Sequence, residues 1–297
     1  MTQRCGFVAV VGAPNAGKST LVNALVGQKV AIVSPKAQTT RTRLMGVAME
    51  GEAQIILIDT PGIFAPTRRL DRAMVAAAWG SLEEAEAILV MVDAAAKRTG
   101  RVERVLEGVA NRPEKKYLVL NKVDLTKKDK LLAIATELNA KVQFDETFFI
   151  AASSGDGVPD LKAHLAGLMP EGPWHFPEDE VSDAPERMLA AEITREQLYR
   201  QLHEELPYQS TVETELFRTR PDGSAEIHQQ IYVARENQRA IVLGKGGSRI
   251  REIGARARAE LSELMGRKVH LFLHVKVKEN WDEDRGVYRD MGLDWVD

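Results

Sequence analysis

The stretch FVAVVGAPNAGKS, residues 7–19, joins a short apolar run to a glycine-rich turn that ends in Lys18 and Ser19. Its second half, GAPNAGKS at 12–19, fits the pattern G-x-x-x-x-G-K-[S/T], whose glycines let successive backbone amides point at phosphate oxygens. The apolar run predicts a buried strand, and the residues after the turn predict a helix whose positive end favours an anion. This stretch therefore predicts a phosphate-binding loop between a strand and a helix.

Four more apolar runs follow at 54–59, 87–93, 116–121 and 147–152. Continuous apolar runs of this length suit strands that are buried on both faces of a parallel sheet. Amphipathic stretches separate them and predict helices at 17–26, 70–84, 101–111, 127–139 and 158–168. Strands that alternate with helices predict a doubly wound, mostly parallel α/β fold.

The second half of the chain begins with a different amino-acid composition. Residues 170–185, PEGPWHFPEDEVSDAP, contain four prolines and five acids, which predicts an extended linker with Trp174 and Phe176 as anchors. After it we expect the order α-β-β-α-α-β, typical of a small α+β domain. These elements are expected at 186–205, 209–219, 225–234, a short helix before 244, 247–265 and 268–278. The predicted organisation is a first domain at 1–170, a linker at 171–185, a second domain at 186–280 and a tail at 281–297.

Charge is unevenly distributed along the chain. Its net charge is −3, yet the window 235–278 holds eleven Lys/Arg against four Glu, a local charge of +7. Such a window favours a polyanionic partner, although a solvated helix face is an equally good explanation of charge alone. One cysteine, Cys5, excludes an intrachain disulfide, and no apolar stretch reaches the ~18 residues of a membrane span. We therefore expect a cytoplasmic protein.

Two polar loops at predicted strand ends suit a bound nucleoside triphosphate. Asp59-Thr60-Pro61-Gly62 ends a strand, so the Asp59 carboxylate can hold Mg²⁺ and the Gly62 amide can contact a γ-phosphate. In the loop KAQTTR at 36–41, Thr40 can complete the magnesium shell together with Ser19 of the phosphate loop. The switch segments of such a site are expected at 33–45 and 62–72.

A third loop selects the base. In Asn121-Lys122-Val123-Asp124, the Asp124 carboxylate can accept hydrogen bonds from the N1–H and the amino group of guanine, which adenine does not present in that arrangement. Lys122 can lie along the base plane, and Asn121 can tie this loop to the phosphate loop. The pattern alone could be an ordinary polar loop. In this order, at strand ends after a phosphate loop, it predicts a GTP-binding domain.

A second glycine loop, Gly244-Lys245-Gly246-Gly247, lies in IVLGKGGSRI at 241–250, between two predicted helices. It lacks the spacing of a phosphate loop and no strand leads into it, although a simple glycine-rich helix turn would look similar. The loop and the α-β-β-α-α-β order resemble the type II KH arrangement, whose G-x-x-G turn clamps about four nucleotides of single-stranded nucleic acid. The candidate RNA-contacting residues are Gly244, Lys245, Gly246, Gly247, Arg249, Arg251, Arg256 and Arg258.

GAPNAGKS, QTTR, DTPG and NKVD together resemble the translation-factor-type GTPases, most closely the Era family, over nearly the whole chain. The resemblance implies a GTP/GDP switch with Mg²⁺ that hydrolyses GTP slowly, and a domain that binds the 3′ end of small-subunit ribosomal RNA on the small ribosomal subunit. It implies that Gly12, Asn15, Ala16, Gly17, Lys18, Ser19, Thr20, Asn121, Lys122, Asp124, Ala151 and Ala152 bind the nucleotide. It implies Ser19, Thr40 and Asp59 as metal ligands and Lys18, Thr40, Asp59 and Gly62 as catalytic residues.

Two residues depart from patterns known in such GTPases. Ala151 stands where the family's base-contacting loop has serine, and we expect the Ala152 amide to reach the guanine oxygen nonetheless. Ile63 follows Asp-Thr-Pro-Gly, where a glutamine would orient the attacking water in Ras-like enzymes, so another route to hydrolysis is implied. In related GTPases, an asparagine at the position of Asn15 helps to coordinate K⁺, although here Asn15 could equally serve only to stabilise the turn.

Other functions fit less well. A membrane-associated signalling GTPase, attached peripherally at the inner face of the membrane, is the main alternative, but no amphipathic anchor or lipidation motif stands in the chain. An RNA-binding protein whose GTPase is a slow timer differs only in emphasis. An ATPase would not need Asp124. No DNA partner is expected, and the chain is expected to be a monomer.

Overall fold

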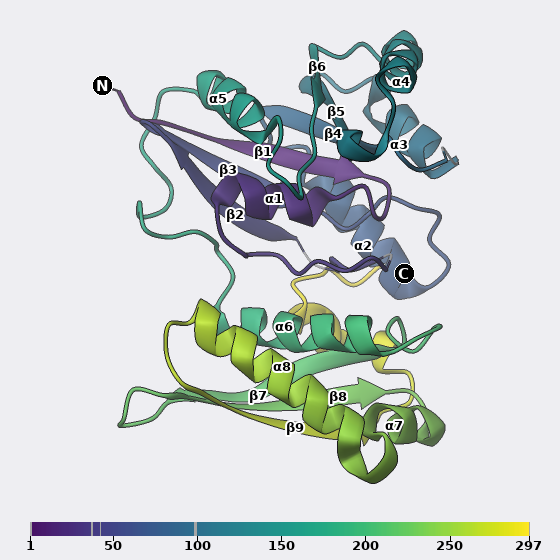
Figure 1. Cartoon of the computed structure of the whole chain (residues 1–297), viewed down its shortest axis with the longest axis vertical. Coiled ribbons are helices and arrows are strands. Elements are labelled where there is room, and N and C mark those ends of the chain that lie inside the picture. The colour runs from purple at the N-terminus through teal and green to yellow at the C-terminus, as the bar shows by residue number, and fades with distance from the viewer. Residues whose placement is uncertain (1, 37, 42, 98–99, 297) are drawn as a thin grey trace. The chain divides into compact units, whose positions relative to one another are not determined.

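The structure, a computed structural model, describes residues 2–36, 38–41, 43–97 and 100–296, with Asp290 described by its backbone only. Ala37 and Thr42 of the expected switch at 33–45 thus lie outside the described residues. The chain divides into two compact units, Met1–Asp183 with Gly292–Asp297, and Ala184–Met291 (Figure 1). Each unit has its own sheet and its own apolar core.

The first unit is built on a six-stranded sheet in the order β2-β3-β1-β4-β5-β6. All neighbouring strands run parallel except β2 and β3, which are antiparallel, so the predicted doubly wound α/β fold is confirmed. The strands are β1 Arg4–Gly12, β2 Leu44–Glu50, β3 Ala53–Asp59, β4 Ala87–Asp93, β5 Lys115–Asn121 and β6 Glu146–Phe149. The helices are α1 Lys18–Val26, α2 Arg69–Gly80, α3 Gly100–Ala110, α4 Lys128–Lys141 and α5 Val158–Leu168, with the 3₁₀ turn η1 Val123–Leu125.

The structure differs from the sequence-based expectation at one strand and two element ends. Strand β2, LMGVAME, was not predicted, because Gly46 divides it into apolar pieces of only two and three residues. Strand β6 ends before the expected 152, since the Ala151 N–H turns back to the Asp156 carbonyl (3.0 Å) instead of continuing the ladder. Helix α2 ends at Gly80 rather than at 84, because Ser81 closes its last turn through Ala77.

Helices cover both faces of this sheet. In β1, Val8, Ala9, Val10 and Val11 are all fully buried, and successive strand side chains point to opposite faces. One core cluster combines β-strand residues with apolar residues of α2, α3 and α4. Figure 1 shows α1 and α5 on the opposite side of the sheet from α2 and α3. The carboxyl ends of the parallel strands are therefore left for loops.

The segment expected as a linker lies against the first unit. The Trp174 indole N–H donates to the Glu52 carbonyl (3.1 Å), and the buried Gln54 amide bonds to the backbone of residues 175–176. Further on, the Val47 N–H donates to the Val181 carbonyl (2.8 Å), and Asp183 bonds to Met45. The segment therefore pairs with the strand that follows the first expected switch.

The second unit has the element order α-β-β-α-α-β, so the predicted fold of this half is confirmed. Its three strands lie in the order β7-β8-β9, with β7 and β8 antiparallel and β8 and β9 parallel. Leu198 and Leu202, Ile231 and Val275 form part of its core. The elements are α6 Glu186–Gln201, β7 Ser210–Thr219, β8 Ala225–Val233, α7 Glu236–Leu243, η2 Lys245–Gly247, α8 Ser248–Leu264 and β9 Val269–Val277.

The C-terminal segment is more ordered than its sequence indicated. It forms the short elements η3 Trp281–Glu283 and α9 Arg285–Asp290, which no periodicity predicted. Trp281 is buried and its indole N–H donates to the Gln209 carbonyl (3.0 Å). In the last residues, grouped with the first unit, the Trp295 ring lies against the Arg69 guanidinium (4.4 Å).

None of the helices in the described ranges has both the length and the apolar character that crossing a membrane would require.

Candidate nucleotide site and nucleic-acid loop

The first glycine turn connects β1 to α1, as residues 7–19 predicted. Gly17 precedes α1 with φ +96°, and a Cβ there would come within 2.2 Å of the Asn121 amide nitrogen. Only glycine meets both demands, because it alone adopts positive φ without steric cost and carries no side chain. The close approach brings the base-selecting loop against the phosphate loop.

Lys18 is buried at the start of α1. Its ammonium donates to the carbonyls of Gly12 (3.3 Å) and Ala13 (3.2 Å). Burial lowers the pKa of Lys18 to about 8, against the opposing attraction of Asp59. A buried cation is costly unless it is compensated by negative charge. Phosphate oxygens in this loop would supply that compensation.

Three oxygen-bearing side chains converge beside Lys18. The Ser19 hydroxyl donates to Asp59 Oδ2 (2.7 Å) and lies 2.8 Å from the Thr40 hydroxyl, which also donates to Asp59 Oδ2 (3.2 Å). Asp59 is fully buried, and among the described residues its Oδ1 has no hydrogen-bond partner. Burial raises the pKa of Asp59, with Ser19 and Lys18 acting in the other direction. A carboxylate and two hydroxyls form a set of hard oxygen donors that fits Mg²⁺.

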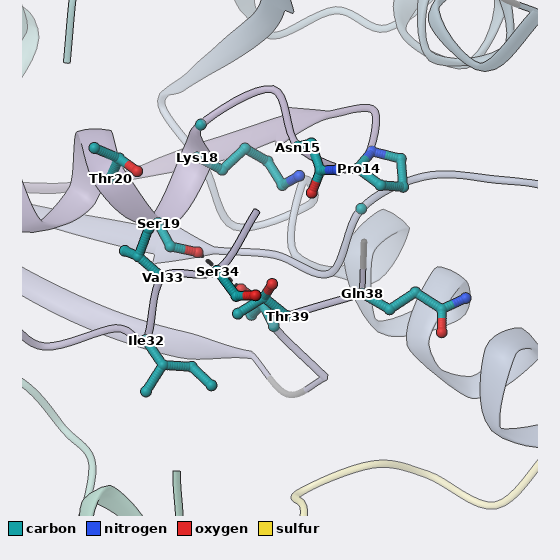
Figure 2. Close-up of a pocket in the computed structure, with 13 residues that line it drawn as sticks. Pro14, Asn15, Lys18, Ser19, Thr20, Ile32, Val33, Ser34, Gln38 and Thr39 are labelled. Carbon is teal, nitrogen blue, oxygen red and sulfur yellow. Dashed lines mark hydrogen bonds between the residues drawn. The ribbon is translucent and has the colours of Figure 1, made fainter. Parts of the chain in front are cut away.

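A pocket opens between the phosphate loop and the first expected switch. Figure 2 shows this pocket with Lys18 and Ser19 at the phosphate loop and with Ser34 and Thr39 on the segment that faces it. The pocket is lined by Pro14, Asn15, Gly17, Lys18, Ser19, Thr20, Ile32, Val33, Ser34, Gln38, Thr39, Thr40 and Gly62. Two predicted metal ligands, Ser19 and Thr40, therefore line the same pocket as the phosphate loop, and the third, Asp59, is hydrogen-bonded to both of them.

Asn121 ties three loops together. Its amide nitrogen donates to the Ala16 carbonyl (2.9 Å), and its Oδ1 accepts from the Ala152 N–H (3.0 Å). The Ala152 amide, expected to reach the guanine oxygen, therefore has an acceptor already, and that role stays a prediction. Ala151 is buried in a turn closed by Asp156, so no side-chain hydroxyl is needed to shape this loop.

Lys122 and Asp124 stand at the end of β5 with different exposures. The Lys122 ammonium donates to the Asn15 carbonyl (3.1 Å) and to Asp93 Oδ2 (2.6 Å). Asp124 lies in η1 with an exposed side chain, as a carboxylate that receives a base must. Asp93 was missed by the sequence reasoning. Its signal was an acidic residue at the end of the apolar run AILVMVD.

The second expected switch begins under the phosphate loop. Ile63 is fully buried in the first unit's core, and its N–H donates to the Gly12 carbonyl (3.1 Å). At Gly62 a Cβ would meet Pro14 at 2.9 Å, so the backbone there runs close to the loop. The Ile63 side chain faces the core, which agrees with its expected inability to orient a water molecule.

Asn15 links the phosphate loop to the first expected switch. It adopts φ +66°, and its side-chain amide donates to the Pro35 carbonyl (3.1 Å). This contact fastens the phosphate loop to the expected switch at 33–45, and a role of Asn15 in stabilising the turn itself stays a prediction. A role in binding K⁺ stays a prediction.

The second glycine loop joins α7 to α8, as predicted, with η2 between them. Gly244, Gly246 and Gly247 all have positive φ (71°, 58° and 76°), while Lys245 and Gly246 are exposed. A Cβ at Gly244 would meet the Arg249 backbone nitrogen at 2.9 Å, whereas nothing lies within 4 Å of one at Gly246. The loop therefore offers bare, accessible backbone with one cation at its tip.

The arginines after this loop differ in their surroundings. Arg249 donates to the Ile241 carbonyl (2.9 Å), which fastens the loop's two flanking helices. Arg251 is exposed on α8 near Gly247, and Arg256 is exposed but paired with Glu252 (2.6 Å). Arg258 is also exposed on α8, so the four predicted arginines comprise one structural arginine and three on the helix surface.

Comparison with known proteins covers both units. The family described as "50S ribosome-binding GTPase" matches residues 7–122, and the KH domain family matches residues 205–282. The chain is 63% identical over 297 residues to the GTPase Era of Erythrobacter litoralis, covering 99% of this chain and 98% of that protein. It is 54% identical to the GTPase Era of Caulobacter vibrioides, covering 98% and 97%.

A solved structure resembles the whole chain. It is Era in complex with MgGDPNP and nucleotides 1506–1542 of 16S ribosomal RNA, with a TM-score of 0.92 and 40% identity. The match covers 98% of this chain and 99% of that one. With the nucleotide loops and the KH loop present in one chain, and relatives aligned from end to end, this chain belongs to the Era family of GTPases.

Proposed function

We propose that the chain is a GTP-binding and GTP-hydrolysing switch that binds the 3′ end of small-subunit ribosomal RNA and assists maturation of the small ribosomal subunit. The observation that carries this proposal is the end-to-end match to Era solved with MgGDPNP and a 16S ribosomal RNA fragment. The alternative of a membrane-associated signalling GTPase is not favoured by these relatives. A cytoplasmic location follows from the ribosomal partner.

In this proposal the phosphate loop holds the triphosphate. Lys18 exchanges its two carbonyl acceptors for β- and γ-phosphate oxygens, which compensates its buried charge. The amides of residues 13–19 and the N-terminal end of α1 surround the phosphates. Thr20, which lines the same pocket, completes the loop's contacts. Affinity for GDP and GTP therefore resides mainly in this loop.

The base is selected on the other side of the site. Asp124 accepts from the guanine N1–H and amino group, and Lys122 lies along the base plane. Asn121 acts indirectly, since its side chain already bonds Ala16 and Ala152. The proposed division of the chain is a nucleotide-binding domain that ends at residue 170 and an RNA-binding domain that begins at residue 186.

Ser19, Thr40 and Asp59 would hold Mg²⁺, and the unpaired buried Oδ1 of Asp59 fits such a ligand. The ion supplies positive charge to the phosphates when it is bound. The chain's own part in hydrolysis would be to place Thr40 and the Gly62 amide by the γ-phosphate, which water attacks. Because Ile63 is buried, it positions no water, so slow intrinsic hydrolysis is expected. K⁺ beside Asn15 would add compensating charge, which a comparison of rates in K⁺ and Na⁺ tests.

The second glycine loop would clamp single-stranded RNA. Positive φ at three glycines exposes backbone that a sugar-phosphate chain can approach closely. Lys245 and the exposed Arg251 would contact phosphates, with Arg256 available once it leaves Glu252. The GTP form would favour RNA binding, since a switch requires different affinities in its two states.

The test is fluorescence anisotropy of a short single-stranded RNA that copies the 3′ end of small-subunit ribosomal RNA, with GDP or a non-hydrolysable GTP analogue. Gly246→Asp/Gly247→Asp should abolish binding by blocking the backbone and adding negative charge. Gly223→Asp is the matched control, because Gly223 has φ +82° with open space around it in another loop of the same unit. The proposal is supported if the wild type and the Gly223→Asp control bind the RNA tightly with the GTP analogue, and the Gly246→Asp/Gly247→Asp variant does not. Equal weak binding in every case contradicts it.

A further inference from the structure

Asp93 lies between the phosphate loop and the base-selecting loop. It is the last residue of β4 and stands in register with Asn121, the last residue of β5. The next residue, Ala94, donates its N–H to the Asn121 carbonyl (2.9 Å). The pairing of β4 with β5 therefore fixes the position of the Asp93 backbone beside Asn121.

Each carboxylate oxygen of Asp93 has its own partners. Oδ1 accepts from the N–H groups of Ala95 (2.9 Å) and Ala96 (3.1 Å), which holds the carboxylate in one orientation. Oδ2 accepts from the Lys122 ammonium (2.6 Å), and the Asp93 side chain is only 18% exposed. A carboxylate oriented by two backbone donors is a preorganised acceptor for a cation.

Lys122 needs such an anchor. It is a non-glycine residue at φ +63°, a conformation that must be maintained by its surroundings. Its ammonium bridges Asp93 and the Asn15 carbonyl (3.1 Å), and Asn15 itself has φ +66°. The bridge therefore joins two locally strained loops, one expected to face the base and one the phosphates.

We propose that Asp93 is a positioning residue for guanine-nucleotide binding, which acts by holding the Lys122 ammonium against the phosphate loop. The inference rests on the proposed role of Lys122 at the base. Within the part of the chain that the structure describes, the hydrogen bonds of Asp93 go to residues 95, 96 and 122 and none goes to the expected switches, so its loss should speed the release of GDP and GTP by the same factor. The pair is partly exposed, which limits the effect to about tenfold.

Asp93→Asn removes the negative charge of the side chain and keeps its shape. The amide oxygen can still accept from residues 95 and 96, but its NH₂ group then faces the Lys122 ammonium, donor against donor. Asp93→Glu keeps the charge and should restore slow release in part. The matched control is Asp145→Asn, which alters a carboxylate that bonds the Lys116 N–H (2.8 Å) at the opposite end of the same sheet.

The experiment measures dissociation rates of fluorescent mant-GDP and a mant-labelled GTP analogue for the wild type, Asp93→Asn, Asp93→Glu, Lys122→Met and the double variant Asp93→Asn/Lys122→Met. We expect Asp93→Asn to raise both rates about tenfold and to add nothing in the Lys122→Met background, whereas the control Asp145→Asn, measured alongside, should leave both rates unchanged. Thermal melting confirms that each variant folds. An equal rise in both backgrounds, or unchanged rates in a folded Asp93→Asn variant, overturns the positioning role. A wild type without guanine-nucleotide binding would instead overturn the proposed function.

Discussion

Gly17→Ala tests the close packing of the nucleotide loops. The new Cβ would lie 2.2 Å from Asn121 Nδ2, so the Asn121 side chain must move. That movement breaks its bonds to the Ala16 carbonyl and the Ala152 N–H, each contributing about 1 kcal/mol. Positive φ at an alanine adds about 1–2 kcal/mol of strain. The expected loss of stability is therefore about 3–4 kcal/mol.

The two costs can be separated with a matched variant. Gly27, after the other end of α1, has φ +87° with nothing within 4 Å of an added Cβ, so Gly27→Ala carries the φ strain alone. Only the broken Asn121 bonds, about 2 kcal/mol, should weaken nucleotide binding, which corresponds to a roughly 30-fold higher Kd. Isothermal titration with GDP and thermal melting measure both effects. If Gly17→Ala binds GDP as tightly as Gly27→Ala, the Asn121 bridge does not support the site.

Three further predictions concern the base, the buried lysine and the core. Asp124→Asn should shift preference from guanine to xanthine nucleotides in competition binding, and unchanged preference would refute base recognition by this carboxylate. Because the pKa of Lys18 is lowered to about 8, that side chain is about half deprotonated at pH 8, and bound phosphates should restore its proton. Calorimetric titrations with nucleotide in buffers of different ionisation enthalpy should then show that binding takes up as much as about half a proton at pH 8. At pH 6.5 Lys18 should take up almost none, and a number of protons taken up that does not change with pH would contradict this. Gly108→Ala should destabilise the fold by about 1–3 kcal/mol because its Cβ would lie 2.0 Å from the Trp79 ring, whereas Gly167→Ala, in a helix with open space, should be neutral or stabilising; equal melting temperatures would refute this packing.

Local patterns were sufficient wherever one segment carried its own signal. Apolar runs located five of the six strands of the first sheet, and Gly17, Lys18 and Ser19 could be assigned to a loop because their spacing carries the chemistry. Strand β2 gave no such signal, since Gly46 interrupts its short apolar run, and it lies at the edge of the sheet as an antiparallel strand. Its place is decided by pairing with β3 and not by its own residues.

The amino-acid sequence by itself determined which chemical groups this protein has and which fold carries them: the phosphate loop, the carboxylate of Asp124 at a strand end, the second glycine loop and five of the six strands of the first sheet. Only the tertiary structure decided which groups meet. Asp93 lies 29 positions from Lys122, and Asn121 lies 31 positions from Ala152, yet each pair forms a hydrogen bond that no sequence pattern predicted. Sequence patterns reflect local periodicity and spacing, whereas such contacts arise from the register of neighbouring strands, which brings distant loops to one edge of the sheet.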